Sequence, residues 1–155
     1  MRALATSVLG GLVGGLLGAG VMSAIHMLVS RVYPPPPAGE TEDATVKIGQ
    51  RLSRLVRGRP LREDEKSTAA TAVHYGFGAA LGATYGVVAA LLPQAAAGRG
   101  VAFGGAAWLG PHALVVPALG LAPSPLRQPP GREALELVLH VLYGVTVEAV
   151  RRLFH

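Results

Sequence analysis

The sequence has no cysteine, few aromatic residues and few charges. Without cysteine it cannot form disulfides, cysteine-ligated iron–sulfur clusters or thiolate zinc sites. Only 15% of its 155 residues are charged and 5% are aromatic, whereas half are hydrophobic. Soluble domains carry roughly 25% charged residues, so this balance favours a membrane protein. The sequence also lacks G-x-S-x-G, H-E-x-x-H and phosphate-loop motifs, and we therefore expect that the protein is not an enzyme.

The basic balance of the chain does not indicate a nucleic-acid partner. The net charge is +5 at pH 7. Eight of the 14 Lys and Arg residues lie in one segment, between Arg31 and Lys66, beside nearly as many acids. Such a segment between apolar runs is typical of contact with anionic lipid headgroups, which is the partner that we expect for it.

Four long apolar runs make up most of the chain. A helix needs about 20 residues to cross the core of a bilayer. We expect one all-α, polytopic membrane domain over residues 1–155, with four transmembrane helices at about residues 4–29, 69–92, 101–121 and 133–154. Both termini then lie on one side of the membrane. The first run is about twice as long as the core of a secretory signal, and no A-x-A site closes it, so we expect a retained helix.

Glycines recur every four residues in the first two apolar runs. The first run has a row at Gly10, Gly14 and Gly18, and the second run has a row at Gly78, Gly82 and Gly86. Gly11 and Gly15 form a second row on the first run. Four-residue spacing places each row on one helix face, where a neighbouring backbone can approach closely. We expect these glycine ladders to pack the helices together and to serve as contact surfaces in a homo-oligomer or a larger membrane complex.

Prolines predict two irregular segments. Residues 34–37 are four prolines, which cannot continue a helix and predict an extended exit from the first span. Pro111 and Pro117 interrupt the third run, and each removes a backbone hydrogen bond, so we expect a kinked helix with His112 at the break.

A short basic helix is predicted in the first long loop. Residues 45–57 place leucines, a valine and an isoleucine on one side and Lys47, Arg51 and Arg54 on the other. We expect this amphipathic helix to lie flat at the membrane surface, with the three basic side chains on anionic headgroups. A partner-binding helix is the alternative. Ser67 or Thr68 would then cap the second span.

Five ionisable residues lie within the apolar runs and are the candidate polar or ligand site: His74, His112, Glu136, His140 and Glu148. Ionisable groups inside a membrane indicate function by default, such as a proton or small-solute path. Imidazole and carboxylate also suit haem or a transition metal as cofactor. The alternative is structural hydrogen bonding, with Glu148 paired to Arg152, Glu136 paired to Arg132, and His112 bound to carbonyls freed by the prolines.

Several segments resemble a known family in order and spacing. The segments GVMSAIHMLVSRVYPPPP, VHYGFGAALGATYGVVAALLP, WLGPHALVVPALGLAPSP and ELVLHVLYGVTVEAVRR resemble the YagU-like inner-membrane proteins of bacteria, a domain of unknown function. The resemblance implies a multi-pass protein of the bacterial inner membrane with cytoplasmic termini. The five candidate residues above match polar positions of the family, whereas His26 has no clear match. Counting basic residues instead places the long loop in the cytoplasm.

These features favour a non-enzymatic packing, scaffold or accessory subunit of a membrane assembly. An intramembrane histidine site for haem, a metal or a proton path is the alternative.

Overall fold

The computed structural model describes residues 1–32 and 43–154, and the predicted proline exit at residues 34–37 lies outside them. The described residues are almost entirely helical and contain no strand. In chain order the elements are α1 (Arg2–Val32), α2 (Ala44–Arg57), α3 (Glu63–Leu91), η1 (Pro93–Ala96), α4 (Val101–Ala107), η2 (Trp108–Val115), α5 (Val116–Ala118), η3 (Pro125–Arg127) and α6 (Pro130–Arg152).

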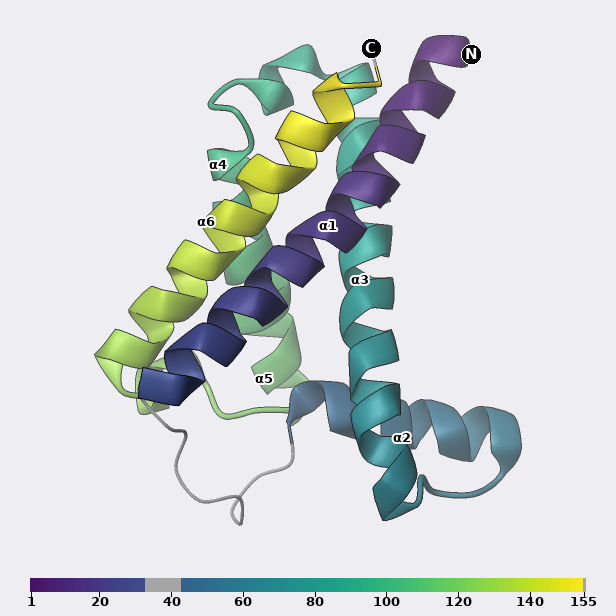
Figure 1. The fold of residues 1–155 in the computed structure, drawn as a ribbon, viewed down its shortest axis with the longest axis vertical. Helices are drawn as coiled ribbons and strands as arrows, with labels where there is room; N and C mark the ends of the chain where they lie inside the picture. The colour runs from purple at the N-terminus through teal and green to yellow at the C-terminus, as the bar shows by residue number, and fades with distance from the viewer. Residues whose placement is uncertain (33–42, 155) are drawn as a thin grey trace.

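Three long helices form the body of the molecule (Figure 1). Helix α1 packs against both α3 and α6, and α4 packs against α6. The short helix α2 crosses the end of α3 that is remote from the chain termini, and both termini lie at the opposite end of the body. Each of the four apolar runs is therefore helical, and α2 is the additional short helix.

Helices α1 and α3 meet through glycines on both sides. Gly11 and Gly15 on α1 lie against Gly78, Gly82 and Gly86 on α3. A Cβ atom added to Gly82 would lie 2.9 Å from the Cα atom of Gly15 and closer still to the carbonyl oxygen of Gly11. A side chain can change rotamer to relieve a close contact, whereas backbone atoms cannot. The observed distance between α1 and α3 therefore requires glycine at this position. It is the second glycine row of α1 that faces α3.

The first glycine row of α1 faces α6 instead. A Cβ atom on Gly14 would lie 2.8 Å from the carbonyl oxygen of Val147, and Gly18 lies against the ring of Tyr143. Helix α4 approaches α6 in the same way. Gly144 lies against the backbone of Gly104, and Gly104 lies against the backbone of His140 and Val141. Contact between backbones is thus the way in which the main helices pack.

The third apolar run is not one regular α-helix. Helix α4 passes into the π-helix η2 at Trp108, and α5 ends at Ala118. Pro111 lies inside η2 and has no N–H to donate. At the end of this segment the N–H of Val116 donates to the carbonyl of Pro111, five residues earlier, which is the π-helical pattern. The sequence predicted a kink at the prolines, and at this place the structure has a π-helical stretch between α4 and α5.

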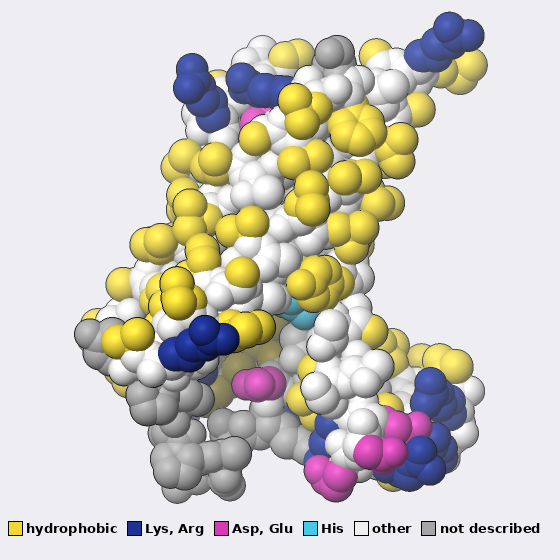
Figure 2. Space-filling view, in the orientation of Figure 1, with side chains coloured by type: hydrophobic (Ala, Val, Ile, Leu, Met, Phe, Trp, Pro, Cys, Tyr) yellow, Lys and Arg dark blue, Asp and Glu magenta, His cyan; other side chains and the backbone are white. Residues whose placement is uncertain are grey.

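Large hydrophobic side chains cover the outside of the helices. In Figure 2, Lys, Arg, Asp and Glu lie towards the two ends, with hydrophobic side chains between them. Leu17, Leu91 and Leu109 are each more than half exposed. Two helical stretches, Arg2–Val32 and Val101–Ala118, are long and apolar enough to span a bilayer. An apolar exterior of this kind fits a membrane protein.

Helix α2 is held to the body by polar contacts. Lys47 Nζ donates to the carbonyl oxygen of Leu121 at 2.8 Å, and Arg51 Nη2 donates to that of Leu119 at 3.2 Å. Gly49 is buried on the side that packs against α3. The two basic side chains therefore satisfy carbonyl groups that follow the end of α5.

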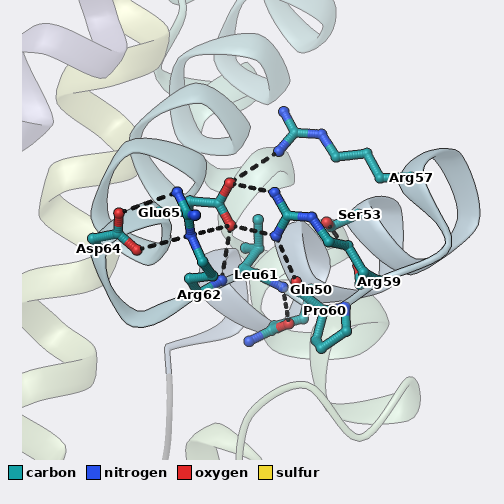
Figure 3. Close-up of polar contacts among 9 residues, drawn as sticks. All are labelled: Gln50, Ser53, Arg57, Arg59, Pro60, Leu61, Arg62, Asp64 and Glu65. Carbon is teal, nitrogen blue, oxygen red and sulfur yellow. Dashed lines mark hydrogen bonds and ion pairs between the residues drawn. The ribbon is translucent and has the colours of Figure 1, made fainter.

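A carboxylate connects α2 to the start of α3 (Figure 3). Both oxygens of Glu65 accept hydrogen bonds from Arg59 at 2.8 Å, and the N–H of Arg62 donates to Glu65 at 2.8 Å. Arg57 adds a longer contact of 3.4 Å. Because Glu65 binds the backbone at the helix start, α3 begins at Glu63 rather than near the predicted residue 69.

Replacing Gly82 by Ala should destabilise the bundle by about 1–3 kcal/mol, because the new methyl group meets backbone atoms of α1. Gly76 lies on the same helix with nothing near its Cβ position, so Gly76→Ala is the matched control. It should stabilise α3 by about 0.5–1 kcal/mol through helix propensity. Thermal unfolding in detergent measures both. Equal effects of the two variants would contradict the close approach of α1 and α3.

The contact between α2 and α3 should weaken in acid. Hydrogen bonds from Arg59 and then from the backbone of Arg62 lower the pKa of Glu65 from 4.5 to about 2. A carboxyl group with a lowered pKa stabilises the fold fully above pH 4.5 and loses that contribution as the pH falls towards 2. Hydrogen exchange of α2, corrected for intrinsic rates, should therefore rise across this window. In Glu65→Gln the hydrogen exchange of α2 should already be raised at pH 6 and should not rise further in acid. A pH profile equal to that of the unchanged protein would refute the role of Glu65 in this contact.

Candidate functional site

Five ionisable side chains gather at the α2 end of the bundle: His26, His112, Glu133, Glu136 and His140. We call them the histidine–glutamate cluster. They come from α1, from η2 and from α6. His26 Nε2 lies 3.4 Å from Glu136 Oε1, and this pair joins α1 to α6. The Glu136 side chain is 15% exposed and the His26 side chain 45%, so the cluster is open on the α1 side.

His140 is held in a defined tautomer. Its Nδ1 atom lies 2.7 Å from the carbonyl oxygen of Glu136, one turn earlier on α6. A carbonyl only accepts, so Nδ1 carries the proton and, in the neutral ring, Nε2 keeps its lone pair. The ring of His140 lies 5.3 Å from the ring of His112, centroid to centroid. His140 therefore presents a proton acceptor inside the cluster.

His112 connects the π-helix to α6. Its Nε2 atom lies 3.2 Å from Glu133 Oε2, and its ring lies 6.3 Å from that of Trp108. Trp108 Nε1 is buried, and among the described residues it has no hydrogen-bond partner. The predicted contact of His112 with carbonyls freed by the prolines is therefore replaced by a hydrogen bond with Glu133.

Two of the predicted site residues lie elsewhere. His74 Nε2 donates to the carbonyl oxygen of Ala19 at 3.2 Å, and its ring meets that of Tyr75 edge to face. Glu148 lies eight residues beyond His140 on α6, about 12 Å along the helix axis. The structure thus brings His112, Glu136 and His140 together and leaves His74 and Glu148 outside.

Glu148 forms the centre of a second, buried group of polar side chains. It is 1% exposed and accepts hydrogen bonds from Tyr85 at 2.9 Å, from Arg151 at 2.7 and 3.0 Å and from Arg152 at 2.6 Å. Arg151 also donates to the hydroxyl of Ser7, which donates in turn to the carbonyl of Gly86. We call Ser7, Tyr85, Glu148, Arg151 and Arg152 the Glu148 network. The predicted pairing of Glu148 with Arg152 is one contact within it.

The predicted pairing of Glu136 with Arg132 is not observed, because Glu136 faces His26 instead. Sequence reasoning missed His26 as a site residue, although a signal was available. In the predicted helices 4–29 and 133–154, His26 lies three residues from the end of one and Glu136 three residues from the start of the other. Antiparallel helices bring such positions to the same depth, so counting inward from the helix ends identifies this pair.

The residues as placed do not form a ready metal site. Within residues 1–32 and 43–154, no group of three or more His, Asp or Glu side chains has an arrangement that could hold a metal ion. Each histidine faces a carboxylate, a carbonyl or another ring. The chemistry that this arrangement supports directly is the exchange of protons between imidazole and carboxylate groups.

Comparison with known proteins gives a family but no activity. Residues 29–149 match a family described as a protein of unknown function, DUF1440. The match includes three of the apolar runs, helix α2, and all of the histidine–glutamate cluster except His26. No curated protein and no solved structure matches the chain.

Removing the charge of Glu148 should destabilise the fold strongly. Glu148→Gln leaves Arg151, whose side chain is 10% exposed, without its carboxylate partner. Breaking one side of a buried ion pair costs about 3–5 kcal/mol. Glu63→Gln makes the same chemical change in an exposed pair with Lys66 and should cost less than about 1 kcal/mol. Unfolding in detergent compares the two variants, and similar losses would contradict a stabilising role for the Glu148 network.

Proposed function

We propose that this chain, which belongs to the DUF1440 family of proteins of unknown function, is a multi-pass membrane protein with a proton path that starts at the histidine–glutamate cluster. The protein would not be an enzyme. The observation that carries the proposal is the convergence of five ionisable side chains, from three helical segments, at the α2 end of the bundle.

The membrane location rests on the apolar exterior and on helix length. Helix α3 has 29 residues and α6 has 23, so each is long enough to cross the bilayer core beside α1 and the stretch Val101–Ala118. Four spans then pack through the glycine rows. The resemblance to YagU-like proteins adds the bacterial inner membrane as the location.

Helix α2 would lie in the headgroup layer. Leu52, Leu55 and Val56 are 49%, 82% and 78% exposed. Figure 2 shows hydrophobic side chains along the edge of α2 nearer the bundle, with charged ones gathered below them. This arrangement suits an apolar face turned into lipid and a basic face turned to headgroups. Lys47 and Arg51 donate to carbonyl oxygens, so Arg54 is the predicted basic residue with most freedom to contact an anionic lipid.

Proton transfer suits the cluster better than a metal or haem. His26 and His112 each face a carboxylate, and the ring of His140 lies 5.3 Å from the ring of His112. Such pairs bind and release protons without a change in fold. A haem or metal built on His74, His112 and His140 would need His74 to leave its contact with Ala19.

The path continues along α6 towards the Glu148 network. Tyr85 of the Glu148 network stacks on Phe103, which lies against Tyr143, and the ring centroids of these two pairs are 4.2 and 5.8 Å apart. The hydroxyl of Tyr85 already donates to Glu148, so the aromatic layer adjoins the second polar group. Transfer across this layer is the step that limits the rate in our proposal.

A packing or accessory role is the second candidate. It was predicted from the glycine rows, which lie against other helices of the same chain. Gly76, Gly105 and Gly110 have nothing near their Cβ positions, and these open positions are where another copy or a larger membrane complex would dock under this proposal.

Proton flux into liposomes tests the first candidate. Purified protein is reconstituted with an internal pH-sensitive dye, and a potassium diffusion potential drives protons inward. We expect His140→Ala and Glu136→Gln to lower the flux by about tenfold or more, because each removes a proton acceptor from the cluster.

His74→Ala is the matched control, since it removes an imidazole that lies outside the cluster. Its flux should equal that of the unchanged protein. A flux no greater than that of empty liposomes, or an equal flux in Glu136→Gln, would overturn the proton path and leave the accessory role.

A further inference from the structure

A cavity at the end of the bundle where the chain termini lie has apolar side chains on one side and basic side chains on the other. Its volume is about 370 Å³, and it lies between the first turn of α1, the last turn of α3 and the last turn of α6. Ala3 and Leu4 line it from α1, and residues 89–91 line it from α3. Arg151 and Arg152 line it from α6. The lining is thus mostly apolar, with two guanidinium groups on one side.

The end of the bundle that holds this cavity is rich in basic residues. Glu148 accepts hydrogen bonds from both arginines of the wall. Arg2 and Arg99 lie at the same end of the chain fold. The other acidic residues of the described chain, Asp43, residues 63–65 and the two glutamates of the histidine–glutamate cluster, belong to the opposite end. The cavity is therefore suited to an anion.

Arg152 is placed to bind that anion. Its side chain is 52% exposed, and its contact with Glu148 is made by Nε. A guanidinium has five N–H donors, so the outer two nitrogens remain available at the cavity. Tyr85 and Arg151 hold the Glu148 carboxylate in place. The hydrogen bond from Arg152 Nε to this carboxylate therefore orients the Arg152 side chain. A planar, fixed guanidinium matches the oxygens of a phosphate group.

The apolar part of the cavity selects a lipid over a soluble phosphate. Leu4 is 40% exposed and Leu91 is 67% exposed, and both belong to the hydrophobic exterior of the bundle. A phosphate on Arg152 would therefore have an apolar surface running away from it along α1 and α3. This is the shape and chemistry of a phospholipid headgroup with its acyl chains.

We propose that the cavity between the ends of α1, α3 and α6 binds an anionic glycerophospholipid, with its phosphate on Arg152 and an acyl chain against Leu4 and Leu91. The site differs from the headgroup contact at α2, which lies at the other end of α3. It depends on the membrane location and not on the proton path.

Native mass spectrometry in a neutral detergent tests the proposal with phosphatidylglycerol and phosphatidylcholine of the same chain length. We expect phosphatidylglycerol to bind about tenfold more tightly, and Arg152→Gln to remove most of that difference. Arg127→Gln is the matched control, because it removes an exposed arginine at the opposite end and should bind as the unchanged protein does. Equal affinity for the two lipids, or an equal loss in both variants, would overturn the site.

A second variant separates lipid binding from folding. Ala90→Phe places a ring at the cavity wall and leaves the Glu148 network intact, so it should also weaken binding of phosphatidylglycerol by about fivefold or more. Unchanged binding in this variant would contradict the acyl contact. Inorganic phosphate and glycerol 3-phosphate should not displace the lipid at equal concentration. Displacement by either would show a simple anion site and overturn the assignment to a lipid.

Discussion

The arrangement of this molecule depends on α1 being able to touch two helices at the level of their backbones. Gly10 and Gly14 meet α6, whereas Gly11 and Gly15 meet α3. Neighbouring residues on a helix point about 100° apart, so pairs of adjacent glycines repeated every four residues give two bare faces side by side. Close packing of backbones at these two faces holds α1 to both partners. A side chain at Gly10 or Gly14 would push α6 away from α1, and one at Gly11 or Gly15 would push α3 away.

The two polar groups depend on this packing. Helix α1 brings His26 to Glu136 near one end of its contact with α6 and Ser7 to Arg151 near the other. Between them α6 contributes Leu139, Tyr143 and Val147 to the core, and all three are nearly inaccessible to solvent. Ionisable groups in a medium of low polarity need partners from neighbouring helices, and each of these groups has one. In the sequence, Glu136, His140 and Glu148 form one polar stripe on α6. In the structure, Glu136 and His140 belong to the histidine–glutamate cluster, whereas Glu148 belongs to the Glu148 network.

The sequence predicted the helices, the all-α class and the break at Pro111, because runs of apolar residues and prolines act locally. It placed Glu136 and Glu148 on one face of α6 correctly, since helical periodicity decides that. What lies opposite each residue is a matter of tertiary packing, and there the predictions were weaker. His26 was set aside, Glu133 was not considered, and Glu136 was paired with Arg132. The sequence did not predict Tyr85 or Ser7 as members of the Glu148 network, because both contacts are long-range. Tyr85 lies 63 residues from Glu148, and Ser7 lies 144 residues from Arg151.

Those separations have a consequence for how the protein is made. In chain order α1 comes before α3, and α6 follows both. Until α6 is made, the face of α1 with Gly10 and Gly14 lacks the helix that it packs against, and neither Ser7 nor His26 has its charged partner. The growing chain therefore cannot complete the bundle at the stage when only α1 and α3 have been made. Translation of the 23-residue helix α6 is the event that allows the bundle to close.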